Sequence, residues 1–496
     1  MGKAGPDILV FMTDQHTPYF SGFMGHNVDT PNMDRLCREG TWFSQAYTPC
    51  PLCVPSRVAM LTGLRPARTG VFTLMDAMPD LTPTFLHYFA EQGYETVLAG
   101  RMHFLGRDQR HGFLRRIAGD TTPVTWNVPK ALLSETRGTF MNNYGEYGAT
   151  SFAGGGGSPV EVYDRYVTDA AVKWLREPHE KPQMIFVSLY GPHFPYVGRK
   201  DLYLKYRSRV KLPPSFKDRV NAEAYKRHVQ AASEEFALAA QAAYCAMIEE
   251  ADGYMGEIRN AFSDFCVSRH SKSMFLYVSD HGDQCGDRSM FGKSTFYEKS
   301  ARIPMIAAGN DIAADHIVKT PVSIMDIGPT LLEYAGITSM DHTDGFSLLE
   351  AFGNREVPEH TVYGEFLERE KMSTPADRYC FMVRKNNYKY ISFREEKGQD
   401  MLFDVDADPD ERENLILREK DKAEEMQEIV KQYEMGSRAV ELEAEHERNL
   451  KLWQAYEKAS GTADNEELWT VDTALFRTEP EICVRNTKKE YRGAGK

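Results

Sequence analysis

The chain has 496 residues, of which 42% are hydrophobic and 26% are charged, a composition close to the average of globular proteins. This composition excludes collagen-like, disordered and disulfide-scaffold classes. The 59 basic and 72 acidic residues give a formal charge of −13, so we expect neither nucleic acid nor an anionic membrane surface as a partner. An acidic chain that binds an anion needs a local positive pocket for it.

The first residues and the cysteine content predict a cytoplasmic protein. A strand-like apolar run begins at Asp7, with no basic region or cleavage site before it that would indicate a signal peptide. No stretch approaches the ~18 consecutive apolar residues of a membrane helix. The eight cysteines are few and irregularly spaced, as in proteins whose thiols stay reduced. We therefore expect a cytoplasmic location.

Four apolar runs share one pattern, because each is rich in strand formers and ends in a polar cluster. A run that is apolar on both faces is typical of a buried parallel strand. Open α/β sheets bind ligands at the carboxyl ends of such strands. The four runs are Asp7–Met12, Thr96–Ala99, Met184–Leu189 and Met274–Val278. The polar clusters that follow them contain Asp14, Gln15, Arg101, His103, His193, Asp280 and His281.

Helical periodicity lies between these strands, and the alternation predicts an α/β fold with a large, mostly parallel central sheet flanked by helices. Residues 119–160, with the glycine tract Gly154–Gly157, predict a long loop over the strand ends. The predicted helices are Pro31–Arg38, Thr84–Gln92, Tyr163–Leu175, Glu234–Phe262 and Ile324–Ala335.

The pattern changes near residue 375, which predicts a smaller C-terminal α+β subdomain. Arg378–Phe393 and Met401–Val405 indicate a short antiparallel sheet, and residues 417–459 indicate one or two charged helices. The remaining residues lack periodicity and resemble an extended arm. We therefore expect three units: a catalytic domain, the subdomain and the arm, at residues 1–375, 376–460 and 461–496.

Cys50 and Cys53 form a C-x-x-C pair whose spacing alone decides nothing. A zinc knuckle needs two further ligands at similar spacing, and none follows. A thioredoxin-type pair lies where a helix begins, which Pro55-Ser56 allows. Two buried loop cysteines with no chemical role are the alternative, and the spacing does not distinguish them.

The longer string around Cys53 is more informative. Cys53-Val54-Pro55-Ser56-Arg57, followed by Leu61-Thr62-Gly63, resembles in full the sulfatase signature C-x-P-S-R-x-x-x-L-T-G. The resemblance covers roughly residues 7–420 and implies the alkaline-phosphatase-like fold and a sulfuric ester hydrolase. Further segments resemble sulfatase motifs in the expected order: Gly93–His103, Gly191–Pro195, Ser279–Gly282, Lys293 ahead of Tyr297-Glu298, Arg302–Pro304, and Leu402–Asp404 with Asp408-Pro409.

The resemblance implies that a maturation enzyme oxidises Cys53 to formylglycine, the nucleophile of the family. The hydrated aldehyde offers two hydroxyls: one attacks sulfur, and the other expels sulfate as the aldehyde re-forms. Arg101 replaces the usual lysine beside the sulfate. His103 would remove a proton from the diol. His193 and Lys293 would face the leaving oxygen, with His193 as the general acid.

The site also requires a hard cation, because negative charge develops on the sulfuryl and leaving oxygens. Asp14, Gln15, Asp280 and His281 are the expected ligands, and helix N-capping is the alternative role of the two aspartates. Mainly oxygen ligands favour calcium; the imidazole makes manganese an alternative, and magnesium is a third. The resemblance implies that Arg57 holds the aldehyde hydrate and contacts this metal shell.

The amide and imidazole ligands resemble the branch of choline sulfatases and phosphonate monoester hydrolases. Phe72-Thr73-Leu74 departs from the choline sulfatase pattern, so we expect another small organic sulfate or a sulfated sugar as substrate. Trp126, with Glu365 or Glu368, is the candidate pocket for a cationic substrate, and loop packing is the alternative role of Trp126. A choline-O-sulfatase and a phosphonate monoester or phosphodiester hydrolase are the alternative functions.

The resemblance also implies a homo-oligomer, because tails in that branch reach a neighbouring subunit and complete its site. Glu479, Glu481, Arg485 and Tyr491 are the candidate residues of the arm. Truncation after about residue 460 is expected to break the oligomer, which light scattering would show as a lower mass. An unchanged mass would reject this role of the arm.

Overall fold

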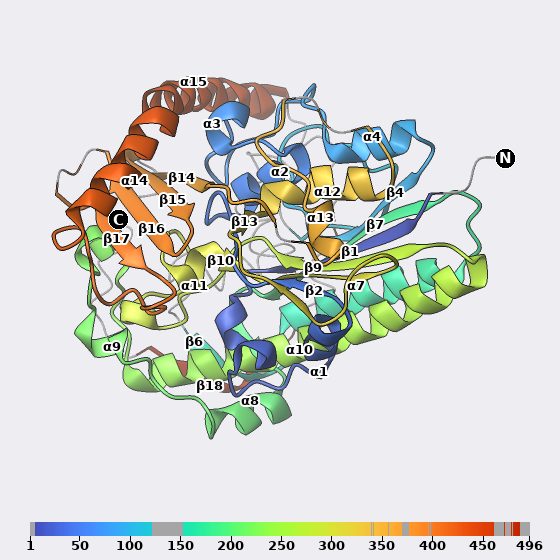
Figure 1. The fold of residues 1–496 in the computed structure, drawn as a ribbon. Coiled ribbons are helices and arrows are strands. Elements are labelled where there is room, and N and C mark those ends of the chain that lie inside the picture. The colour runs from blue at the N-terminus through green and yellow to red at the C-terminus, as the bar shows by residue number, and fades with distance from the viewer. Residues whose placement is uncertain are drawn as a thin grey trace.

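A sheet of eight strands forms the centre of the molecule in the computed structural model (Figure 1). The structure describes residues 5–121, 152–338, 340, 342–355, 357–369, 376–394, 396, 398–460, 471, 478 and 480–486. The strands are β1 Asp7–Asp14, β2 Thr41–Phe43, β4 Glu95–Gly100, β5 Arg115–Ala118, β7 Gln183–Pro192, β9 Ser273–Ser279, β11 Met305–Gly309 and β12 His316–Val318. Their order in the sheet is β12-β2-β11-β9-β1-β7-β4-β5.

The four strands predicted from the sequence, β9, β1, β7 and β4, are consecutive neighbours in this sheet. They pair in parallel, as β4 does with β5, whereas β11 runs antiparallel to β9 and to β2. The predicted large, mostly parallel sheet is therefore confirmed. Because neighbouring parallel strands end at the same edge, the four polar clusters meet there.

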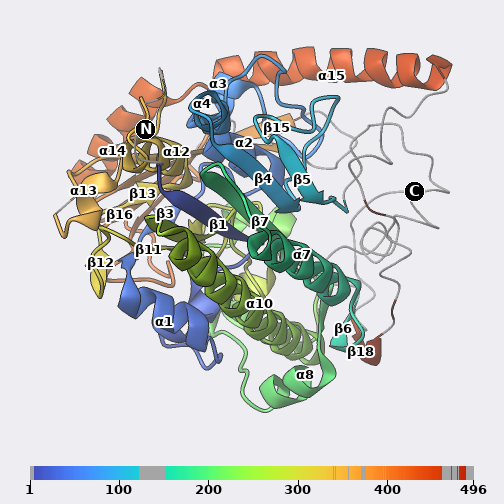
Figure 2. The same cartoon turned by 90° about the vertical axis from the view of Figure 1, so that its right-hand side faces the viewer.

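Alternate side chains of β1 pack into two separate cores, one on each face of the sheet. Ile8 and Val10 join a cluster with α2, α4 and α12, and Leu9 and Phe11 join one with α1, α7 and α10. Figures 1 and 2 show these helix groups on opposite faces. The predicted α/β sandwich is confirmed. The helices are α1 Pro31–Glu39, α2 Cys53–Thr62, α4 Phe85–Glu91, α7 Pro159–Arg176, α10 Glu234–Arg269 and α12 Ile327–Tyr334.

The longest helix, α10, has 36 residues and extends for about 54 Å at the usual rise per residue. The side chain of Ser233 caps its first turn by accepting a hydrogen bond from the N–H of Phe236. Its interior is rich in alanine, which lets α8 (Lys200–Arg207) and α7 pack closely against it. No helix in the described part of the chain is long and apolar enough to cross a membrane.

A second, antiparallel sheet of four strands lies at one end of the molecule, with two C-terminal helices beside it (Figure 1). The sheet begins at Val362, so a strand upstream of the boundary predicted at residue 375 belongs to it. The division into three units stays a prediction. The elements are β14 Val362–Arg369, β15 Ala376–Lys385, β16 Tyr388–Phe393, β17 Met401–Asp404, α14 Lys420–Tyr433 and α15 Gly436–Ser460.

The prediction of one long loop over residues 119–160 is wrong where the structure describes them. Phe152–Gly156 forms strand β6, which pairs with β8 (Tyr196–Gly198) and with β18 (Pro480–Arg485) of the tail. A Cβ on Gly154 would lie 1.8 Å from the carbonyl oxygen of Ile482. Glycine is required here because β18, from the C-terminal end of the chain, packs against this position. Local sequence patterns do not reveal such a distant partner. Residues 122–151 lie outside the described residues.

Substitution of Gly154 by alanine is expected to weaken the pairing of β6 with β18, because the new methyl group overlaps a backbone carbonyl. The free energy of unfolding should fall by about 1–3 kcal/mol, and hydrogen exchange of residues 480–485 should accelerate. Gly253→Ala is the matched control. That glycine lies exposed in α10, where an added Cβ would meet no atom within 4 Å, so alanine should stabilise the helix by about 0.5–1 kcal/mol. Equal effects of the two substitutions would contradict the packing argument.

Candidate active site

One buried guanidinium, that of Arg57, joins the ends of the four central strands. It donates to Asp280 at the end of β9 (2.9 Å) and to Asp14 at the end of β1 (2.8 Å). It also donates to the hydroxyl of Ser188 on β7 (3.0 Å) and to the carbonyl oxygen of Arg101 after β4 (2.6 Å). The clusters after β1, β4 and β9, together with Ser188 of β7, therefore form one site.

Cys53 is the first residue of α2, and the sequence of the motif explains why the helix starts and stops where it does. Pro55 lies in the first turn, where a missing N–H costs nothing. Gly63 ends the helix in the left-handed conformation, with a φ of 66°. The cysteine is 1% exposed, so it lies at a helix N-terminus inside the protein. This position favours a negatively charged group.

Four polar side chains surround the Cys53 sulfur. The Lys293 ammonium lies 2.9 Å from Sγ, His281 Nε2 3.3 Å, an Asp14 carboxylate oxygen 3.7 Å and an Arg101 guanidinium nitrogen 3.9 Å. Burial raises the pKa of the Cys53 thiol, and Lys293 opposes that rise. Cations and hydrogen-bond donors are thus arranged around the residue that the sequence predicts as the nucleophile precursor.

Three of the predicted metal ligands, Asp14, Asp280 and His281, have ligand atoms within 4.8 Å of one another, together with that of Cys53. Nδ1 of His281 lies 3.0 Å from the Gly282 carbonyl oxygen and donates a hydrogen bond to it, so Nδ1 keeps the proton and Nε2 is unprotonated toward the site. Burial lowers the pKa of His281 to about 3, against the effect of Asp280. Burial favours a raised pKa for Asp280, but His281, Arg57 and Lys293 together hold it well below its ordinary value.

Gln15, the fourth predicted ligand, lies beside Asp280. Its backbone has a φ of 68°, and its N–H donates to Asp280 at 3.0 Å. Its side-chain nitrogen donates to Asp283 at 2.6 Å, and its buried Oε1 has no hydrogen-bond partner among the described residues. A buried carbonyl oxygen of this kind is costly unless it meets a donor or a cation. The donor set of two carboxylates, one amide oxygen and one neutral imidazole nitrogen fits a divalent metal ion.

Arg101 and His103 follow β4 and lie beside the ligands. Gly100 has a φ of 96°, and a Cβ there would lie 2.1 Å from the Ser188 carbonyl oxygen, so only glycine lets the chain turn this close to β7. The Arg101 guanidinium pairs with Asp14 and lies 2.8 Å from Nδ1 of His103. Burial, then Arg101, lowers the pKa of His103 well below its ordinary value. His103 is therefore a neutral imidazole at pH 7.

The role of His193 as general acid stays a prediction, and the contacts of this residue favour a proton acceptor instead. Its Nδ1 lies 2.8 Å from the carbonyl oxygen of Phe194, which can only accept, so Nδ1 carries the proton and Nε2 is an acceptor. Burial, followed by Lys293 and Arg101, lowers the pKa of His193 well below its ordinary value. A neutral imidazole with an unprotonated Nε2 accepts a proton more readily than it donates one.

The contacts of Arg57 concern the predicted metal ligands more than the predicted nucleophile. Its hydrogen bonds go to the two aspartates, Ser188, a backbone carbonyl and the Met102 sulfur, and none of those between described residues goes to Cys53. It thus contacts two of the predicted metal ligands, and its hold on the hydrated aldehyde stays a prediction. Arg57 is a positioning residue for the ligands in this structure.

The carboxylates proposed for a cationic substrate are occupied by arginines of the chain itself. Glu365 pairs with Arg65 at 3.1 Å and accepts from the N–H of Ala67. Glu368 accepts from Arg378. Both are 0–1% exposed, so neither is available to a bound cation. Trp126 lies outside the described residues.

Sequence reasoning missed a group of residues that contact the site residues or the backbone next to them. Tyr190 lies against the Arg101 guanidinium, 4.6 Å from its ring centroid. Asp120 accepts from the N–H groups of Met102 and His103, and Asp164 from those of Tyr190 and Gly191. Tyr190 directly follows the predicted strand Met184–Leu189, and this position is the signal that could have found it. The two aspartates lie outside every motif, and only the fold brings them to the strand ends.

A family model described as Sulfatase matches residues 6–337 of the chain. The chain belongs to the sulfatase family. A second model, described as N-sulphoglucosamine sulphohydrolase, C-terminal, matches residues 286–439. The match to the Sulfatase model confirms the resemblance that the motifs indicated and the expectation of a sulfuric ester hydrolase.

Relatives of this sulfatase include a choline-sulfatase of Rhizobium meliloti, 29% identical over 445 residues that cover 84% of this chain and 83% of that protein. A solved 2-O GAG sulfatase superimposes with a TM-score of 0.66 at 22% identity and covers 96% of this chain and 97% of that one. The phosphonate monoester hydrolase of Agrobacterium radiobacter superimposes with a TM-score of 0.67 at 20% identity. The superposition covers 88% of this chain and 96% of that one. The two structures confirm the fold.

Replacement of Arg57 by lysine is expected to lower the free energy of unfolding by about 3–5 kcal/mol, because the two buried carboxylates lose the guanidinium that donates to both of them. Added calcium or manganese should restore part of this loss, since a divalent cation also neutralises Asp14 and Asp280. Thermal unfolding with and without each metal measures both effects. Arg35→Lys, at an exposed pair with Glu39, is the control and should change stability by less than about 0.5 kcal/mol. An Arg57→Lys protein as stable as the parent would contradict the central role of this guanidinium.

Proposed function

We propose that this sulfatase hydrolyses a sulfate monoester, of a sulfated sugar or another small organic sulfate, at the pocket around Cys53. One observation carries the proposal: Cys53 is buried at the N-terminus of α2, among Lys293, Arg101 and the ligand set of Asp14, Asp280 and His281. Conversion of Cys53 to formylglycine by a maturation enzyme would supply the hydroxyl nucleophile. This places the reacting group where donors and cations already converge.

The residues around the pocket would bind the sulfate group and orient it. Asp14, Gln15, Asp280 and His281 would hold a divalent cation, which supplies charge stabilisation to the sulfuryl oxygens. Calcium suits the oxygen ligands, and manganese suits the imidazole. Arg101, fixed between Asp14 and the ring of Tyr190, would donate to a sulfuryl oxygen.

Lys293 is the better candidate for the group that protonates the leaving oxygen. Its ammonium carries a proton and lies 2.9 Å from the Cys53 sulfur, and burial lowers its pKa from the ordinary lysine value. A lowered lysine pKa brings the group closer to the range in which it donates at neutral pH. His103 and His193, both neutral, would accept protons or hydrogen bonds, which suits His103 for the diol hydroxyl.

The substrate class is inferred from two buried carboxylates that are already paired within the chain. Glu365 and Glu368 are neutralised by Arg65 and Arg378, so the described residues provide no free carboxylate at these positions for a quaternary ammonium. This favours an uncharged or anionic alcohol part, such as a sugar, over choline. Phosphonate monoester or phosphodiester hydrolysis is the second candidate, because these esters carry a charge similar to that of a sulfate ester and the fold is shared with a phosphonate monoester hydrolase.

The homo-oligomer, the maturation enzyme and the cytoplasmic location stay predictions. The described residues of the tail are relevant to the predicted homo-oligomer. Strand β18 pairs with β6 of its own chain, and Glu481 pairs with Lys200. Arg485 is exposed on that strand. Glu479 and Tyr491 lie outside the described residues.

Protein produced together with a formylglycine-generating enzyme is expected to release nitrophenol from nitrophenyl sulfate faster than from a phenylphosphonate monoester. Mass spectrometry of the peptide with residue 53 should show that its sulfur is replaced by an aldehyde oxygen. Cys53→Ala should lower kcat by roughly 10³-fold or more, because the nucleophile is lost. A screen of sulfated sugars and choline sulfate then measures kcat/KM for each substrate class.

Cys483→Ala is the matched control, since this cysteine lies exposed on β18 and should leave activity unchanged. Unmodified cysteine at position 53 in an active preparation would overturn the formylglycine route. Faster turnover of the phosphonate ester than of any sulfate ester would favour the second candidate. Choline sulfate as the best substrate would contradict the charge argument.

A further inference from the structure

The side chain of Gln15 is held at one end and free at the other, although it is completely buried. Its Nε2 donates a hydrogen bond of 2.6 Å to the Asp283 carboxylate, while its Oε1 has no hydrogen-bond partner in the described part of the chain. The backbone of Gln15 is fixed as well, because its N–H donates to Asp280 and its carbonyl oxygen accepts from the hydroxyl of Tyr244 at 2.6 Å. A half-turn of the amide about its last bond would exchange its nitrogen and its oxygen, so the partner of Nε2 decides where the oxygen lies.

Asp283 itself has no freedom to turn. One or both of its oxygens accept from the hydroxyl of Tyr196 (2.8 Å) and from the backbone N–H groups of Cys285 (2.7 Å) and Gly292 (2.9 Å). A carboxylate in this setting only accepts, so it selects the NH₂ group of Gln15 over its carbonyl. The Gln15 oxygen is consequently turned away from Asp283.

We propose that Asp283 is the positioning residue that orients the Gln15 amide so that its carbonyl oxygen is the fourth ligand of the cation held by Asp14, Asp280 and His281. The inference rests on the proposed function in that it takes these four residues as metal ligands. It assigns Asp283 a role in metal affinity without direct contact with the metal. Partners of this type often change the affinity by 10- to 100-fold.

The same contact explains why an amide occupies position 15. A carboxylate there would lie at hydrogen-bond distance from the buried carboxylate of Asp283, and the two would repel each other unless one of them took up a proton. Glutamine provides an oxygen for the cation and a donor for Asp283 in one side chain. The identities of residues 15 and 283 are therefore coupled.

A double-mutant cycle on the metal-free full-length protein tests this coupling, with titration calorimetry of Mn²⁺ and Ca²⁺ as the readout. Asp283→Asn should weaken binding by roughly 10- to 100-fold, because the new amide no longer selects one orientation of Gln15. Gln15→Glu should weaken it as well, through repulsion by Asp283. The double variant Gln15→Glu/Asp283→Asn should regain most of the affinity, since the carboxylate introduced at position 15 can accept from the asparagine NH₂ and still offer an oxygen to the metal.

Asp252→Asn is the matched control for the loss of a buried carboxylate. Asp252 is 1% exposed and accepts from the backbone N–H groups of Asn32 and Met33, but it belongs to α10 and not to the ligand set. This variant should lose stability with an unchanged metal affinity. Thermal unfolding of each variant separates misfolding from a local effect.

Three results would overturn the inference: an Asp283→Asn protein that binds both metals as the parent does, a double variant whose loss equals the sum of the single losses, or a parent protein that binds neither metal. Turnover of sulfate esters is measured separately. If the parent hydrolyses sulfate esters and the cycle shows no coupling, the role of Asp283 fails and the proposed function stands. If the cycle shows coupling and no sulfate ester is hydrolysed, the role of Asp283 stands and the proposed function fails.

Discussion

The structure depends above all on one buried ion-pair network, in which Arg57 meets Asp14 and Asp280. A buried charge is tolerated only when it is paired and fully hydrogen bonded, so the two carboxylates and the guanidinium must come together or remain in water. Their positions bring the ends of β1 and β9 to the first turn of α2. Because Cys53 lies one turn before Arg57 on that helix, folding of the network also places the sulfur beside the ligands.

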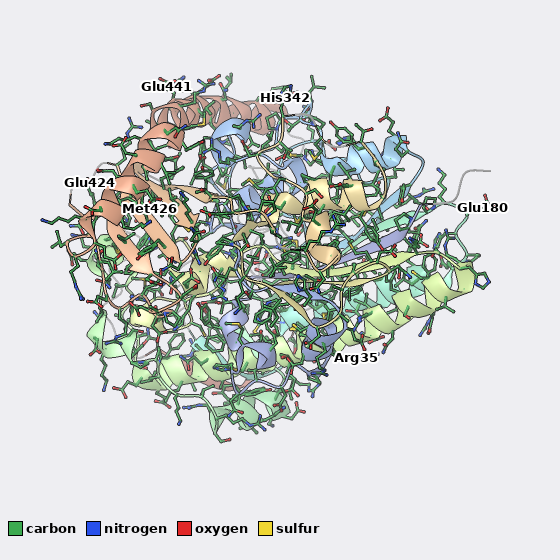
Figure 3. The ribbon with its side chains drawn as sticks, in the orientation of Figure 1. Arg35, Glu180, His342, Glu424, Met426 and Glu441 are labelled. Atoms are coloured by element: carbon green, nitrogen blue, oxygen red, sulfur yellow. The ribbon has the colours of Figure 1, made fainter. Side chains whose placement is uncertain are left out.

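The acidic net charge and the anionic substrate are compatible because the charges are separated in space. Charged side chains such as Arg35, Glu424 and Glu441 lie at the periphery (Figure 3). At the candidate active site, three cationic side chains, those of Arg57, Arg101 and Lys293, lie near the two carboxylates of Asp14 and Asp280. A divalent cation would increase this positive excess, in a buried place where the surrounding water screens little.

The sequence predicts those parts of the fold and site that local patterns encode. The four central strands, the helices between them and the signature around Cys53 depend on composition over a few residues, and the structure confirms their type and position. Strand β6 could not be predicted, because its glycines are explained by β18, more than three hundred residues away. The proton on His193 could not be predicted either, since the Phe194 carbonyl that fixes it depends on the geometry of the turn.

Buried aspartates outside the motifs give the strand ends their rigidity. Asp120 holds the segment of His103, Asp164 holds the turn before His193, and Asp283 holds Gln15. Gln15 and His103 both have positive φ angles, which cost energy in a non-glycine residue and persist only when neighbouring groups impose them. Each carboxylate accepts hydrogen bonds from the segment that it supports and thereby offsets the cost. Part of the excess acid of the chain is therefore inside the protein, where it fixes the groups that bind an anion.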